Sequence, residues 1–257
     1  MSGHSKWSTI KRKKGAQDAK RGALFGKLSR AITVAAREGG GDPEMNPALG
    51  LAIHKAREAN MPNDNIQRAM DKGTGAHGEA ETFERITYEG YAPGGVAVMV
   101  EVLTDNRNRA ASDVRYIFSK NGGKLGTSGS VAYLFERKGV MLVPKEGVDE
   151  DEVMELALEG GAEDVETMER DYRVVTAPED FTAVRDSLRE AGVAFENAEI
   201  TMQPQNSVEL DSATAKQTLR LVDALEENDD VQEVYANFDI SDEVMAVAFD
   251  EVAKPRK

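Results

Sequence analysis

The stretch that decides the fold runs from Val140 to Met202 and reads VMLVPKEGVDEDEVMELALEGGAEDVETMERDYRVVTAPEDFTAVRDSLREAGVAFENAEITM. Short β-rich segments alternate in it with amphipathic helical patterns. We expect strands at 140–143, 164–167, 172–175 and 198–202, and helices at 151–158 and 179–190. That order is βαββαβ, the ferredoxin-like unit. The sequence therefore predicts one complete α/β domain, placed at residues 138–205.

The flanking segments predict a second α/β domain that is split in two by the first. Before the unit, strands are expected at 96–103 and 131–135 around a helix at 108–121. After it, strands are expected at 207–210 and 231–238 around a helix at 213–227. Joined, these halves would form another βαββαβ, so we expect the middle unit to be inserted into its neighbour, with tandem domains as the alternative. The split domain would span 82–137 plus 206–240, followed by a C-terminal segment at 241–257.

The N-terminal residues 1–75 predict a basic three-helix domain. A helix is expected at 16–37, with a core-facing stripe made of Leu24, Leu28, Ala31, Ile32 and Ala35. Asn46 and Pro47 are a good N-cap and first-turn pair for a second helix through Ala59, with Leu49, Ala52, Ile53 and Ala56 facing inward. Met61-Pro62 should break that helix, and a third helix at 63–72 should end at Gly73. The predicted fold class is α+β: three helices, then two ferredoxin-like domains.

Positive charge is concentrated at the start of a chain whose formal net charge is −14. Residues 1–37 hold one acid, Asp18, and ten basic residues: Lys6, Lys11, Arg12, Lys13, Lys14, Lys20, Arg21, Lys27, Arg30 and Arg37. Segregated basic segments of this kind usually meet phosphate, which predicts nucleic acid or the ribosome as partner. The plainer alternative is a solvated helix face with a solubilising tail. Trp7, the only tryptophan, could stack on a base or anchor the segment on the protein itself.

The second half of the chain is unsuited to binding bare duplex DNA. Residues 131–257 hold twelve basic and thirty-two acidic residues, so they would repel phosphate. Any phosphate contact must come from the N-terminal domain or from a local basic patch.

The sequence has two glycine-rich stretches that could be considered for phosphate binding. Gly73, Gly75 and Gly78 match a dinucleotide-binding pattern in letters, but they follow a helix and open a polar linker, which argues against that function. The loop 121–130 could let backbone N–H groups approach phosphate or RNA, with Arg107, Arg109 and Lys120 near it in the sequence. It could equally be a flexible connection. It is not a Walker A loop, because Leu125 follows Lys124 where Ser or Thr must hold magnesium.

Catalysis has little support in the sequence. The three histidines are scattered, and there is no cysteine, so no triad, metal site or cofactor site can be assembled, and no small-molecule substrate is indicated. The acidic runs at 149–152 and 226–230 are expected to be solvated helix ends. No apolar run approaches the ~18 residues of a membrane span. The absence of cysteine fits the cytoplasm.

Long motifs make the chain resemble the YebC family. They are Gly3-His4-Ser5-Lys6-Trp7, the stretches 16–22 and 33–43, Ala59-Asn60-Met61-Pro62, Tyr88-Glu89-Gly90-Tyr91, 104–109 and 129–135. The resemblance implies a helical domain and two α/β domains, the third inserted in the second. Members are commonly described as DNA-binding transcriptional regulators, mitochondrial relatives as translational activators, and some bacterial members as helping ribosomes through proline-rich stretches. Ala92 and Ala110-Ala111-Ser112 depart from the usual pattern but lie outside the basic blocks.

These observations predict a non-enzymatic, cytoplasmic regulator of gene expression that binds DNA or ribosomal RNA. Lys11 to Lys14 and the helical stripe Lys20, Lys27, Arg30 and Arg37 would contact phosphates, with Lys6, Trp7 and Arg21 beside them. Arg107, Arg109 and Lys124 would form a second contact surface. The alternatives are an enzyme with a site between the α/β domains, which needs a perturbed carboxylate pair there, and a protein-interaction module, which needs an exposed apolar patch.

Overall fold

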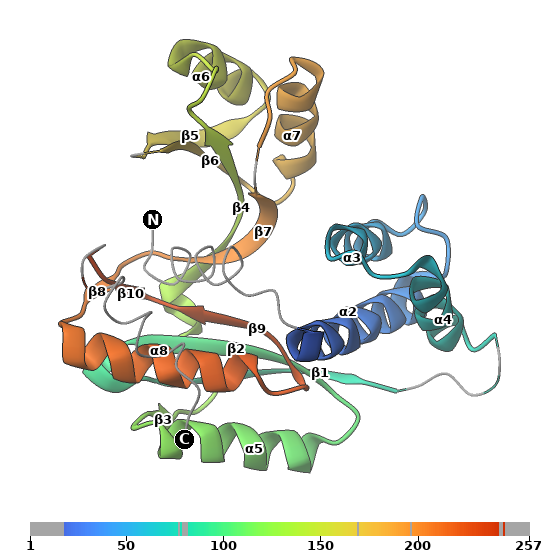
Figure 1. Ribbon diagram of the computed structural model, residues 1–257, viewed down its shortest axis with the longest axis vertical. Coiled ribbons are helices and arrows are strands. Elements are labelled where there is room, and N and C mark those ends of the chain that lie inside the picture. The colour runs from blue at the N-terminus through green and yellow to red at the C-terminus, as the bar shows by residue number, and fades with distance from the viewer. Residues whose placement is uncertain are drawn as a thin grey trace. The chain divides into compact units, whose positions relative to one another are not determined.

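The computed structural model describes residues 18–76, 78, 82–168, 170–195, 197–241 and 244, with side chains from Gly22 onward (Figure 1). The chain divides into two compact units. One is Tyr133–Asn206, called here the inserted unit. The other combines the residues before Tyr133 with those after Asn206 and holds the helical domain and an α/β domain. The α+β class with a helical N-terminal domain is confirmed.

The helical domain is built from α2 (Asp18–Gly39), α3 (Pro47–Glu58) and α4 (Asn63–Thr74). The predicted start of α3 is confirmed: Pro47 is its first residue, and the Asn46 side chain accepts a hydrogen bond from the Leu49 N–H at 3.1 Å. The same side chain donates to the Ala35 carbonyl at 2.8 Å, so this cap also fixes the turn between α2 and α3. The core includes the four α3 residues that the spacing predicted: Leu49, Ala52, Ile53 and Ala56.

The predicted core stripe of α2 is wrong at its N-terminal end. Leu24 is 45% exposed, whereas Leu28 and Ala31 are partly buried and Ile32 and Ala35 lie in the core. In this part of α2 the neighbouring residue, Phe25, packs against the core of the helical domain. Leu24, one residue earlier, lies about 100° away around the helix and is left exposed.

The sequence predicts that α4 ends at Gly73, but in the structure it does not. The helix continues to Thr74, and Gly75 takes the left-handed cap at φ 72°. Gly73 is instead buried against α2, where an added Cβ would meet the Thr33 carbonyl oxygen and come within 2.9 Å of the Ala36 Cβ. A glycine is needed there for the two helices to approach each other.

We therefore expect Gly73→Ala to destabilise the helical domain by about 1–3 kcal/mol, since overpacking outweighs the gain in helix propensity. Gly22→Ala is the matched control, because Gly22 lies in α2 with nothing within 4 Å of its added Cβ. That variant should gain roughly 0.5–1 kcal/mol. Urea unfolding of both variants measures the difference. Equal midpoints would show that the helices can separate without loss.

The α/β domain is an antiparallel sheet with order β3-β1-β2-β9. Its elements are β1 (Glu84–Tyr91), β2 (Ala97–Thr104), α5 (Arg107–Lys120), β3 (Lys124–Leu125), α8 (Ser212–Glu226) and β9 (Val231–Ala236), with β8 (Val208–Glu209) pairing in parallel with β10 (Phe238–Asp239). One face of the sheet packs on α5 and α8. The core there includes Val98, Val100 and Val102 of β2, Phe118 of α5 and Leu219 of α8.

Three strand assignments in this domain differ from the prediction, and one of them is β3, which falls in the stretch expected to be a loop. The segment expected as a strand at 131–135 is a short 3-10 turn, Ala132–Leu134, and Phe135 begins a strand of the inserted unit. The strand β1 was missed, because Glu89 and Gly90 are poor strand formers. The domain therefore starts with a β1–β2 hairpin and does not have the expected βαββαβ order.

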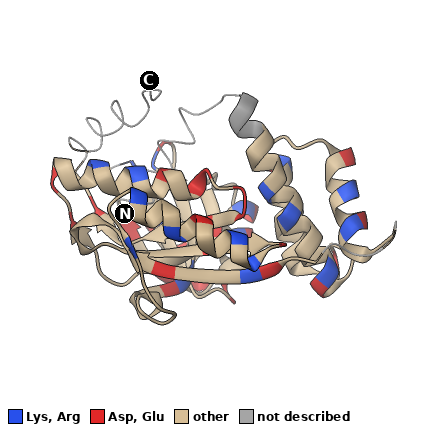
Figure 2. Ribbon diagram, turned by 90° about the horizontal axis from the view of Figure 1, so that it is seen from below, with Lys and Arg blue, Asp and Glu red and all other residues tan. Residues whose placement is uncertain are grey.

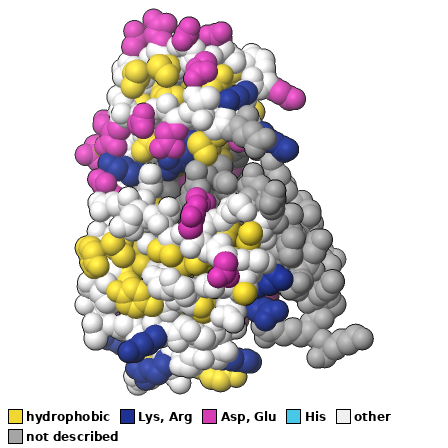
Figure 3. Space-filling model, turned by 90° about the vertical axis from the view of Figure 1, so that its left-hand side faces the viewer, with side chains coloured by type: hydrophobic (Ala, Val, Ile, Leu, Met, Phe, Trp, Pro, Cys, Tyr) yellow, Lys and Arg dark blue, Asp and Glu magenta, His cyan; other side chains and the backbone are white. Residues whose placement is uncertain are grey.

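The inserted unit has the predicted βαββαβ order. Its elements are β4 (Phe135–Pro144), α6 (Glu150–Glu159), β5 (Ala162–Thr167), β6 (Asp171–Thr176), α7 (Phe181–Glu190) and β7 (Asn197–Pro204). The sheet order β5-β6-β4-β7 is the ferredoxin-like arrangement. The unit carries nineteen acidic and seven basic residues, and Asp and Glu side chains gather over its outer end (Figure 3). Such a surface repels phosphate.

Candidate nucleic-acid interface

The predicted nucleic-acid-binding residues fall into three groups. Lys6, Trp7, Lys11, Arg12, Lys13 and Lys14 lie outside the described residues. Lys20, Arg21, Lys27, Arg30 and Arg37 are all on α2. Arg107 and Arg109 lie in the first turn of α5, and Lys124 lies on β3. The structure brings Arg30 of α2 and Arg109 of α5 to the same carboxylate, that of Asp230.

Two basic residues of α2 bind the chain itself. Their partners lie in the segment Glu226–Asp230, called here the acidic loop, which runs from the last residue of α8 to the residue before β9. Lys27 Nζ donates to the Glu226 carbonyl, and Arg30 donates to the Asp229 carbonyl. Arg30 also pairs with Asp230 at 3.3 Å. The acidic loop thus binds two of the side chains, Lys27 and Arg30, that the sequence predicts to contact phosphate.

Asp230 is the centre of this contact, and its side chain is only 7% exposed. Its Oδ2 accepts hydrogen bonds from the Thr104 hydroxyl at 3.0 Å and from Arg109 Nη2 at 2.8 Å. Its backbone carbonyl accepts from the Leu103 N–H at 2.8 Å. The expectation that residues 226–230 form a solvated helix end is therefore wrong for Asp230, because two arginines reach it from α2 and α5.

Arg109 joins the acidic loop to the start of α5. Besides Asp230, its Nη2 donates to Asp105 at 2.7 Å. Hydrogen bonds to Asp230 first, and to Asp105 second, raise the pKa of the guanidinium. The Arg109 hydrogen bond also lowers the pKa of Asp105, with a further contribution from the charge of Arg30. These charges therefore compensate one another within the protein.

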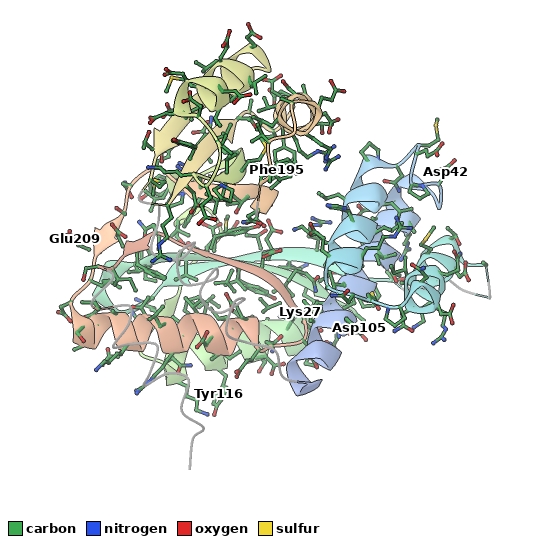
Figure 4. All side chains as sticks on the ribbon, turned by 45° about the horizontal axis from the view of Figure 1, so that its top comes forward. Lys27, Asp42, Asp105, Tyr116, Phe195 and Glu209 are labelled. Atoms are coloured by element: carbon green, nitrogen blue, oxygen red, sulfur yellow. The ribbon has the colours of Figure 1, made fainter. Side chains whose placement is uncertain are left out.

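A cleft of about 650 Å³ opens beside this network. Figure 4 labels Lys27 and Asp105 in this region, where α2 meets the α/β domain. Its charged lining mixes three cations with four acids: Arg30, Lys72, Arg109, Asp105, Asp113, Asp229 and Asp230. The four carboxylates outnumber the three cations, so the cleft offers phosphate no net positive site.

The glycine-rich loop at 121–130 is closed by an internal anion. Glu89 of β1, which is 5% exposed, accepts hydrogen bonds from the N–H groups of Gly129 at 2.6 Å, Val131 at 2.7 Å and Ala132 at 2.8 Å. Burial raises the pKa of this carboxyl, but the three N–H groups together lower it below its ordinary value. Three N–H groups in and just after the loop that could have approached phosphate are thus satisfied by the protein's own carboxylate.

Sequence reasoning missed Glu89 and Asp230, whose roles depend on partners distant along the chain. It also missed Arg115 and Tyr116, which are exposed on the outer side of α5 together with Lys120. The spacing of Tyr116 and Lys120, four residues apart on a helix, was the available signal.

Known proteins match this chain along most of its length. Residues 5–76 match the model of the TACO1/YebC protein N-terminal domain, and residues 83–238 match that of the TACO1/YebC second and third domain. A protein of Rubrobacter xylanophilus named probable transcriptional regulatory protein is 77% identical over 96% of this chain and 98% of its own length. A protein of the same name from Syntrophus aciditrophicus is 56% identical over 95% of this chain and 98% of its own. A crystal structure from Aquifex aeolicus, titled a conserved hypothetical protein, is 53% identical with a TM-score of 0.77, over 88% of this chain and 93% of that one. The chain belongs to the TACO1/YebC family.

Proposed function

We propose that this protein is a non-enzymatic regulator of gene expression that binds nucleic acid through its basic N-terminal segment. The observation that supports this most is the charge of residues 1–37, ten basic residues against one acid in a chain of net charge −14. The names of the relatives favour regulation at the level of transcription, hence DNA. The absence of cysteine favours the cytoplasm as the place of action.

Residues 1–17, together with Lys20 and Arg21, are the best candidates for the phosphate contacts. The intramolecular partners of Lys27, Arg30 and Arg109 already satisfy much of their charge. We infer that these three residues mainly hold α2 on the α/β domain. Arg37, Arg107 and Lys124 remain proposed contacts, and each is exposed.

A second candidate partner is ribosomal RNA, with the ribosome as the site of action. The acidic inserted unit favours it, because nineteen acids against seven basic residues would oppose a domain lying along a duplex. A basic segment can instead enter among the phosphates of structured RNA while acidic domains face solvent or protein.

No catalytic role is part of this proposal. Within the described parts of the chain, no group of three or more His, Asp or Glu residues could hold a metal ion. The helices described there include none that is both long and apolar enough to cross a bilayer.

Deleting residues 1–17 tests the proposal. The deletion removes five basic residues and leaves the described core of α2, α3 and α4 in place. We expect binding to duplex DNA and to ribosomal RNA to weaken at least about tenfold in filter-binding assays. On duplex DNA the slope of log K against log salt should become shallower by roughly 4 to 5.

The control replaces the five basic residues with glutamine in the full-length chain, which keeps the length and removes the charge. It should reproduce the deletion. Undiminished binding by either variant contradicts the proposed role of the segment. Sedimentation with ribosomes distinguishes the two partners, since a DNA regulator has no reason to co-sediment.

A further inference from the structure

We propose that the outer face of α5 binds single-stranded nucleic acid by stacking an unpaired base on Tyr116. This inference rests on the proposed nucleic-acid function and adds a site that is separate from the N-terminal segment. The face is defined by Ser112, Arg115, Tyr116, Ser119 and Lys120, all of them exposed.

Tyr116 presents an open aromatic ring. It is 61% exposed, and Figure 4 shows it on α5, directed away from the body of the α/β domain. Lys120 Nζ lies 5.2 Å from the ring centroid, in cation–π contact with the ring. A cation on one side leaves the opposite side of the ring for a base. Base–aromatic stacking of this kind needs an unpaired base and tolerates any sequence.

The charge of α5 fits a phosphate backbone. The helix carries Arg107, Arg109, Arg115 and Lys120 against one acid, Asp113, and blue segments mark the Lys and Arg residues on it (Figure 2). Arg109 is held by Asp230, and Asp113 lines the cleft beside α2. The outer face itself therefore has two cations and no acid, in a protein of net charge −14.

Two arginines of α5 lie near Tyr88 of β1. Burial raises the pKa of the Tyr88 hydroxyl, and the nearby charges of Arg107 and Arg115 partly offset that rise. Arg107 and Arg115 are thus near enough to Tyr88 for their charges to act on it, and Lys120 lies beside the Tyr116 ring. A strand crossing the helix would meet cations on both flanks of the ring.

Fluorescence anisotropy with a labelled twelve-nucleotide oligo(U) RNA tests this site on the full-length protein. We expect Tyr116→Ala to weaken binding roughly five- to 150-fold, the usual range for losing one stacked base. Tyr133→Ala is the matched control, since Tyr133 is 67% exposed but lies outside α5, and it should bind like the unaltered protein.

A charge variant, Arg115→Gln with Lys120→Gln, should make the salt slope shallower by about 1.4 on single-stranded RNA. Arg137→Gln with Arg170→Gln removes two exposed cations from the inserted unit and should leave the slope unchanged.

Tyr116→Trp, made together with Trp7→Phe, places the single tryptophan in this site. The fluorescence of this tryptophan should be quenched by oligo(U) but not by a twelve-base-pair duplex.

The outcomes separate this site from the proposed function. If the unaltered protein binds RNA and Tyr116→Ala binds equally well, the α5 site is wrong and the nucleic-acid function stands. If the unaltered protein binds no nucleic acid, both are wrong. If a poly-glutamate peptide quenches the tryptophan at position 116 and oligo(U) does not, the face binds acidic protein and the proposal is overturned.

Discussion

Replacing Asp230 with alanine should lower the free energy of unfolding by about 2–4 kcal/mol and loosen α2 from the α/β domain. The variant removes the acceptor shared by Arg30, Arg109 and the fully buried Thr104 hydroxyl. A hydrogen bond to a charged group is worth roughly 1.5–3 kcal/mol, and Thr104 would lose its buried carboxylate acceptor. The two arginines are partly exposed, so water can hydrate their guanidinium groups once the carboxylate is gone. The expected cost is therefore smaller than the sum of the separate contact energies.

Two measurements check this expectation. Urea unfolding gives the change in stability, and limited proteolysis reports whether α2 becomes accessible. Asp229→Ala is the control, because the Asp229 side chain is exposed and the Arg30 hydrogen bond goes to its backbone carbonyl, which the substitution keeps. Equal stability of the two variants would mean that the Asp230 contacts contribute nothing to docking.

Replacing Glu89 with glutamine should cost about 2–4 kcal/mol and remove a pH-dependent part of the stability. The amide keeps one acceptor oxygen but turns an NH₂ group toward N–H donors that the carboxylate now satisfies. Each buried donor left unsatisfied costs roughly 1–3 kcal/mol. The loop from Gly126 to Ala132 should therefore lose its fixed shape first.

The pH dependence follows from the direction of the shift. Because the pKa of Glu89 is lowered from 4.5 in the folded protein, its contribution is complete above about pH 4.5 and is lost as the pH falls through the lower, folded value. Unfolding curves between pH 7 and pH 3 should thus converge for the protein and the Glu89→Gln variant. Glu84→Gln, on an exposed position of the same strand, should parallel the unaltered protein. Parallel curves for Glu89→Gln would contradict the assignment.

The sequence predicted those parts of the fold that short-range patterns determine. The start of α3 follows from Asn46 and Pro47, and its buried face from the spacing of Leu49, Ala52, Ile53 and Ala56. In the inserted unit every predicted strand and helix is present, because each has its own apolar period and turn residues. The strand β1 was missed because its buried residues include Glu89 and Gly90. Glu89 is explained by the N–H groups that it accepts from residues 129–132, and Gly90 by the Lys124 carbonyl and the Phe118 ring, which leave no room for a Cβ.

The site was less predictable, because charge alone does not identify a partner. The basic side of α2 was visible in the sequence, but the acceptors of Lys27 and Arg30 lie 199 residues further along the chain. No local sequence pattern distinguishes a lysine that binds a nucleic-acid phosphate from one that donates to a carbonyl of the protein itself. The same holds for the end of the loop at 121–130, where the N–H groups of Gly129, Val131 and Ala132 donate to the Glu89 carboxylate of β1.

The ends of the inserted unit have a consequence for how the chain reaches its fold. Its first and last strands pair directly, with Phe135 opposite Pro204, and the Gln205 N–H donates to the Leu134 carbonyl at 2.9 Å. Once β4 and β7 have paired, the two halves of the α/β domain are held close together, as the strands of a hairpin are. Bringing these halves together then no longer carries the entropic cost of closing a loop as long as the inserted unit. Contacts between β2 and β9, which look remote along the chain, then become effectively local. We expect the inserted unit to fold first and to set the rate at which its host can follow.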